Sequence, residues 1–88
     1  MNKRQINLLS KKLKAITEPN RLRVLDLLQI SPMFVKDIKK MTKIEETLLS
    51  FHLKILRLAG LVTTQRKGKM VLYIISQPVK ITEKGVQF

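Results

Sequence analysis

The chain has 88 residues, which is the size of one small domain with a single modest core. Its 18 Lys and Arg residues outnumber 6 Asp and Glu residues, and the net charge of +12 favours a polyanionic partner such as DNA or RNA. Because the chain has no Cys and only one His, disulfides, thiolate zinc sites and multi-His metal sites are excluded within one chain. We therefore expect no bound metal, no cofactor and no enzyme activity.

Membrane association is the least favoured explanation of the positive charge. No apolar run approaches the roughly 20 residues that a membrane-spanning helix needs. The first 16 residues include basic side chains, but Ser10, Lys11 and Lys12 interrupt their apolar positions, so they form no signal-peptide core. The sequence predicts a soluble, cytoplasmic, nucleoid-associated protein without membrane contact.

Three helices are predicted before residue 42. Residues 3–16 have apolar side chains at spacings of three and four, typical of one face of an amphipathic helix. These side chains are Ile6, Leu9, Leu13 and Ile16. A second helix begins at Pro19, whose missing N–H needs no partner in a first turn, and runs to about Gln29. Its outer face is predicted to carry Arg21, Arg23 and Asp26. A short third helix over 34–41 follows the break at 31–33.

The second half of the chain predicts a fourth helix, a hairpin and a tail. The fourth helix spans 45–59, and Gly60 supplies the left-handed residue that ends it. Two β-rich runs within 61–76 flank Lys67-Gly68, which is a hairpin signal. In the tail, 77–88, Thr82 and Glu83 predict a last short helical turn.

This order of elements predicts a mostly α fold with a small β-hairpin, namely a winged helix-turn-helix. Residues 1–88 would form a single domain. The helix-turn-helix would span 34–59 and the wing 61–76, with the tail at 77–88. Three cations at the hairpin tip would contact DNA: Arg66, Lys67 and Lys69. Cations near the helix-turn-helix would hold phosphates: Lys36, Lys39, Lys40 and Lys43.

The fourth helix has the division that a recognition helix needs, with one side in the core and a narrow polar strip opposite. The polar strip contains Glu46, Thr47, Ser50, Lys54 and Arg57. The core side contains Leu49, His52, Leu53, Leu56 and Ala59, and the apolar arc extends through Leu48, Phe51, Ile55 and Leu58. An ordinary solvated helix face is the alternative, but the net charge and the basic hairpin favour nucleic-acid contact.

Three residues of this helix, Phe51, His52 and Glu46, keep two interpretations each, and Glu45 has one. Phe51 could touch a thymine methyl group or cover the core or a partner chain. His52 could be a structural residue or donate its ring N–H to a phosphate. Glu45 is most simply a helix-end charge, whereas Glu46 lies on the strip, where it would repel phosphate or accept a hydrogen bond from cytosine.

Three stretches together resemble the ArsR/SmtB family of small winged-helix transcriptional repressors. They are "ITEPNRLRVLDLL", "SFHLKILRLAGLV" and "RKGKMVLYII", and the similarity covers about residues 8–76. The resemblance implies a homodimer that represses transcription from an operator dyad. It implies DNA contacts at Glu46, Thr47, Ser50, Phe51 and His52 and, in the wing, at Arg66, Lys67 and Lys69. The family usually has Ser, Gln and a polar or basic residue at positions 45, 46 and 51, so its base preferences are not carried over.

The resemblance also bears on metals and on the dimer. Metal-sensing members have Cys-x-Cys at the start of the third helix, where this chain has Phe34 and Lys36. Other members sense metals on a long C-terminal helix that also packs the dimer, and the tail predicts at most a remnant of it. We therefore expect no metal sensing and a dimer interface supplied mostly by the first helix: Ile6, Leu9 and Leu13.

The favoured interpretation is a sequence-specific regulator of double-stranded DNA, a homodimeric repressor that binds a palindromic operator through helix 45–59 and the basic wing. One alternative is a non-specific architectural module that binds DNA or RNA, which the net charge supports equally. Another is a winged-helix module for protein interaction, with Phe51 and Leu58 as its contact patch.

Overall fold

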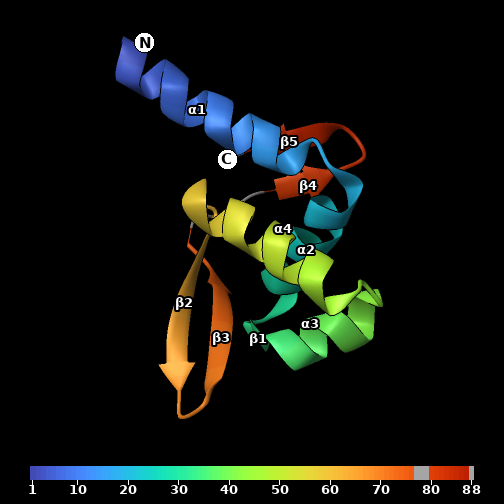
Figure 1. The fold of residues 1–88 in the computed structure, drawn as a ribbon. Coiled ribbons are helices and arrows are strands. Elements are labelled where there is room, and N and C mark those ends of the chain that lie inside the picture. Colours follow the sequence, from blue (N-terminus) through green and yellow to red (C-terminus); the bar gives the residue numbers. More distant parts are fainter. Residues whose placement is uncertain (77–79, 88) are drawn as a thin grey trace.

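The computed structural model describes residues 1–76 and 80–87. The elements are α1 (Lys3–Ile16), α2 (Pro19–Ile30), β1 (Met33–Phe34), α3 (Val35–Thr42), α4 (Glu46–Leu58), β2 (Val62–Lys67), β3 (Met70–Ile75), β4 (Lys80–Thr82) and β5 (Gly85–Gln87). Helices α2, α3 and α4 form the body, the β2–β3 hairpin extends from it, and the N-terminal part of α1 projects beyond it (Figure 1). The predicted winged helix-turn-helix is confirmed.

Local side-chain bonds define where the helices begin. At α1, the Asn2 side chain accepts the Gln5 backbone N–H at 2.8 Å and the Gln5 side chain accepts the Asn2 N–H at 2.9 Å, which is a capping box. At α2, Pro19 occupies the first turn and the Glu18 carboxylate accepts the Arg21 N–H at 3.0 Å. These caps satisfy backbone donors that a helix start leaves without partners.

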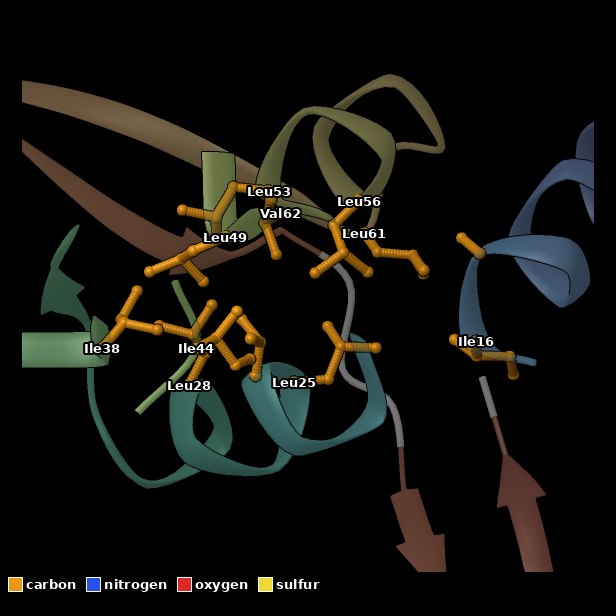
Figure 2. Packing of buried hydrophobic residues seen from close by; sticks show 12 residues of the cluster. Ile16, Leu25, Leu28, Ile38, Ile44, Leu49, Leu53, Leu56, Leu61 and Val62 are labelled. Atoms are coloured by element: carbon orange, nitrogen blue, oxygen red, sulfur yellow. The ribbon is translucent and has the colours of Figure 1, made fainter. Parts of the chain in front are cut away.

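One hydrophobic core joins the body, the base of the hairpin and the end of α1 (Figure 2). Leu25 and Leu28 of α2 face Leu49, Leu53 and Leu56 of α4 across it. The remaining labelled members come from five other segments: Ile16, Ile38, Ile44, Leu61 and Val62. Because α4 has its buried residues on one face only, the opposite face is left outside the body.

The hairpin is part of a three-stranded sheet with the order β1-β3-β2. Strand β3 pairs antiparallel with β2 from Val62↔Ile75 to Lys67↔Met70, and β1 pairs with β3 at Met33↔Tyr73 and Phe34↔Leu72. The sequence did not predict β1, because a strand of two residues has no periodicity to detect. Phe34, predicted as the first residue of the third helix, instead ends β1 and precedes α3.

The predicted helical turn in the tail is wrong. Strands β4 and β5 form a small antiparallel hairpin in which Thr82 pairs with Gly85. The Thr82 hydroxyl accepts the Lys84 N–H at 3.2 Å, so it organises a tight turn instead of a helix start. Gly85 follows with φ of 132°, a backbone conformation that other residues rarely adopt. Residues 77–79 and 88 of the predicted tail lie outside the described part of the chain.

Candidate nucleic-acid interface

The turn between α3 and α4 is closed by bonds within its own residues. Lys43 adopts a left-handed conformation with φ of 58°, and its N–H donates to the Lys39 carbonyl at 2.8 Å. This conformation costs a residue with a side chain about 1–2 kcal/mol, which the closing bond helps to offset. The buried Thr42 hydroxyl donates to the Ile38 carbonyl at 2.7 Å and accepts the Ile44 N–H at 3.3 Å.

An arginine of α2 holds the same turn from outside. The Arg23 guanidinium donates from Nη2 to the Thr42 carbonyl at 2.8 Å. The sequence predicted Arg23 only as an outer-face residue, and its contact lies 19 residues away along the chain, so no local pattern indicates it. The bond links the turn between α3 and α4 to α2.

The two acids at the start of α4 have separate contacts. The Glu45 carboxylate accepts the backbone N–H groups of Thr47 at 2.9 Å and Leu48 at 3.1 Å. These two bonds lower the pKa of Glu45 below its ordinary value of 4.5, because they favour the charged form. Glu46 lies one residue into the helix, and its carboxylate is 3.5 Å from the Lys39 ammonium of α3. Both groups of this ion pair are largely exposed.

The outer face of α4 presents a continuous exposed strip. It contains Glu46, Thr47, Ser50, Phe51, Lys54 and Arg57. The opposite face buries Leu49, His52, Leu53 and Leu56. Phe51 is 53% exposed, and its ring centroid lies 5.7 Å from that of the buried His52, so the ring packs beside His52 while about half of the residue faces solvent. Leu48 and Leu58, which the sequence placed on an extended apolar arc, are also exposed.

His52 is an interior residue, and this position does not fit the direct DNA contact predicted for it. Only 4% of it is exposed, and its Nδ1 lies 3.2 Å from Nη1 of Arg21. A guanidinium can only donate, so Nδ1 accepts and Nε2 carries the proton in the neutral ring. The Nε2 atom lies 3.6 Å from a Glu18 carboxylate oxygen, too far for a hydrogen bond. Of the two roles the sequence left open, burial favours the structural one.

The wing presents its cations at the far end of the β2–β3 hairpin (Figure 1). Arg66, Lys67 and Lys69 are all exposed. The Arg66 Nε donates to the Gly68 carbonyl at 3.2 Å, across a two-residue turn that Gly68 opens with φ of 64°. The turn therefore gives the Arg66 side chain a backbone contact at the tip of the wing.

The remaining predicted contact residues lie on two parts of the surface. The cations of α3 and the turn are exposed: Lys36, Lys39, Lys40 and Lys43. On α1, Ile6 and Leu13 are about half exposed and Leu9 is half-buried. These three apolar residues line a shallow groove of about 410 Å³ along one side of the helix, together with Met1 and Thr17.

Two further features of the described residues concern metals and membranes. In residues 1–76 and 80–87, no three His, Asp or Glu side chains lie close enough together to hold a metal ion. None of the helices in these ranges is long and apolar enough to cross a membrane.

A family model described as "Bacterial regulatory protein, arsR family" matches residues 18–64, which include α2, α3, α4 and the start of β2. The transcriptional repressor SdpR of Bacillus subtilis is 36% identical over 75% of this chain and 73% of its own length. The regulator NmtR of Mycobacterium tuberculosis is 34% identical over 69% of this chain, which spans about half (51%) of NmtR.

Solved structures share the fold. HlyU from Vibrio cholerae superposes with a TM-score of 0.79 and 30% identity, covering 88% of this chain and 83% of HlyU. The homodimeric winged helix-turn-helix DNA-binding domain of Mb0332 from Mycobacterium bovis has a TM-score of 0.80 and 29% identity, covering 88% of this chain and 74% of that domain.

Proposed function

The chain belongs to the arsR family of bacterial regulatory proteins, and we propose that it forms a homodimer that represses transcription by binding a palindromic operator in double-stranded DNA. Its relatives are transcriptional regulators, and the proposal includes no catalytic step, cofactor or metal. The site of action would be the chromosome, in the cytoplasmic nucleoid. Repression would be steric, because a dimer on an operator occupies DNA that the transcription machinery needs.

The observation that carries the proposal is the outer strip of α4. Its centre has the short side chains of Thr47 and Ser50, which permit close approach to base edges. Lys54 and Arg57 extend the strip toward the C-terminal end of α4, where they would contact the backbone or bases. Phe51, at the edge of the strip, fits a thymine methyl group. Glu46 would accept a hydrogen bond from cytosine or repel phosphate.

The basic groups around the strip would position the protein without reading sequence. The cations of α3 and the turn would hold phosphates on one side of the groove: Lys36, Lys39, Lys40 and Lys43. The wing would reach the flanking backbone or minor groove with Arg66, Lys67 and Lys69. His52 would act indirectly, through its place on the buried face of α4.

The exposed apolar side of α1 supports the dimer. Ile6 and Leu13 are large apolar side chains that a monomer would leave in water, next to the half-buried Leu9. A second α1 packed along this side would bury them, and Mb0332, of the same fold, is a homodimer. The test is the mass of the particle in solution for Leu13→Glu. A matched control is Leu48→Glu, because Leu13 and Leu48 are 45% and 43% exposed.

We expect a dimer for the unchanged protein and for Leu48→Glu, and a folded monomer for Leu13→Glu. A folded Leu13→Glu dimer would remove α1 as the interface. Circular dichroism of each variant separates loss of assembly from loss of folding.

The decisive test of operator binding is selection of bound fragments from a randomised DNA library. Two α4 helices entering successive major grooves predict a palindrome whose half-sites lie about 34 Å, or 10–10.5 base pairs, apart. Thr47→Ala and Ser50→Ala should change which half-site is enriched, whereas Lys67→Gln should weaken binding to every sequence about equally.

Enrichment without a palindrome would overturn the dimeric operator, and no enrichment would identify a non-specific nucleic-acid module. No binding at moderate salt would instead favour a protein-interaction module.

A further inference from the structure

A second groove lies between α1 and the C-terminal turns of α4, which run beneath α1 in Figure 1. Its volume is about 470 Å³, within the range of about 300–1,000 Å³ that small-molecule sites occupy. Ala15, Ile55, Leu58 and Ala59 supply its apolar lining. Leu58 is 65% exposed, so a large apolar side chain in this groove is without a covering group in the described protomer.

The other lining residues are all cations: Lys11, Lys14 and Arg21. Lys11 and Lys14 are exposed, and the structure gives neither ammonium group an acidic partner within the described residues. The nearby Glu18 does not line the groove, since its carboxylate is directed to the start of α2 and to His52. An apolar lining with three positive groups is complementary to an amphipathic anion.

The guanidinium of Arg21 is already held in place by hydrogen bonds before any anion binds. Its Nε donates to the Ala15 carbonyl at 2.6 Å, one Nη contacts His52 at 3.2 Å, and the other reaches the Lys14 carbonyl at 3.4 Å. A guanidinium has five N–H donors. Three are used here, which leaves two without a recorded partner in the described residues. The bonded donors hold the planar group in place, so little side-chain entropy remains to be lost when an anion binds.

The same charges argue against a second α1 as the occupant. Residues 3–16 contain no acid and five cations: Lys3, Arg4, Lys11, Lys12 and Lys14. A partner's α1 inserted in this groove would bring like charges against Lys11, Lys14 and Arg21, which is unfavourable. The groove is also distinct from the apolar side of α1 assigned above to the dimer, although Lys14 lines both.

We propose that the groove between α1 and α4 binds a small amphipathic carboxylate. The alkyl or aryl part lies on Ile55, Leu58 and Ala59, and the carboxylate is held by Arg21 with Lys11 or Lys14. The proposal concerns binding alone and does not rest on DNA recognition. It is therefore tested without DNA, and its failure would leave the operator proposal intact.

The probe is octanoate, added to ¹⁵N-labelled protein below its micelle-forming concentration. 1-Octanol and octylammonium serve as neutral and cationic probes of equal chain length. We expect saturable amide shifts confined to the residues around the groove for octanoate, at least about tenfold weaker binding of octanol, and no saturable binding of octylammonium. Equal binding of all three probes would overturn the proposal, because it would show an apolar surface that does not select for anions.

Matched variants localise the effect. Lys11→Glu/Lys14→Glu should weaken octanoate binding by about tenfold or more, whereas Lys3→Glu/Arg4→Glu, with the same change in net charge on the same helix, should leave it unchanged. Leu58→Gln should weaken it, and Leu48→Gln on the same helix should not. The proposal fails if octanoate shifts no amide signal of the groove but raising the protein concentration does. That result would show that a second copy of the chain occupies the groove.

Discussion

The Arg21 guanidinium lies 3.2 Å from Nδ1 of His52, and with its other bonds the same side chain joins three helices. Arg21 belongs to α2, its Nε donates to the Ala15 carbonyl of α1, and His52 lies on the buried face of α4. The projecting helix assigned to the dimer and the helix assigned to DNA are therefore bonded to the same side chain.

Arg21→Lys tests this contact while keeping the charge. A single ammonium cannot reach both the Ala15 carbonyl and His52, so a buried acceptor loses its donor. We expect the free energy of unfolding to fall by about 1–3 kcal/mol, measured by urea denaturation. Arg4→Lys on the exposed part of α1 is the control and should change it by less than about 0.5 kcal/mol. Equal midpoints for both variants would show that the contact does not stabilise the fold.

Glu45→Gln tests the carboxylate at the start of α4. Hydrogen bonds from Thr47 and Leu48 N–H groups lower the folded pKa of Glu45 below 4.5, so its contribution is present above the unfolded pKa and is lost as the pH falls through the folded pKa. We expect the variant to be less stable at pH 7, with the difference from the unchanged protein vanishing in acid below pH 4.5. Thermal denaturation across pH 2–7 measures it, and a pH-independent difference would contradict the assigned cause.

Glu46→Gln tests the acid on the outer strip. Removing its charge frees Lys39 and eliminates repulsion of phosphate, so non-specific DNA affinity should rise by roughly two- to fivefold at low salt. The ratio of specific to non-specific affinity should fall. Binding to a selected site and to an unrelated duplex measures both. If neither affinity moves, Glu46 is only solvated surface.

Neutral substitutions in the wing test its phosphate contacts. The three variants are Arg66→Gln, Lys67→Gln and Lys69→Gln. Each variant that loses one phosphate contact should show a slope of log affinity against log salt concentration that is smaller in magnitude by about 0.9. Base preference should be unchanged, because these contacts read no sequence. Lys3→Gln on α1 should leave the slope unaltered. A wing variant that changes the selected sequence but keeps the slope would indicate base contact instead.

Local patterns were enough for the helices and the wing. The spacing of Leu9, Leu13 and Ile16 marks α1, and Gly60 and Gly68 mark the end of α4 and the wing turn, because these signals depend on neighbours a few residues apart. The exposed strip of α4 follows from the same periodicity, since a helix with one buried face must present the other.

Long-range contacts had to be seen in three dimensions. Arg21 and His52 are 31 residues apart, Arg23 and Thr42 are 19 apart, and β1 pairs with β3 across α3 and α4. Each contact depends on packing that brings distant segments together. The sequence pattern therefore predicted Arg21 as an outer-face residue, because it does not show His52 beside it. For that reason composition and periodicity indicated a basic DNA-binding domain and placed His52 on the core side of α4, whereas the contact of His52 with Arg21 and the cation-lined groove emerged only from the packed helices.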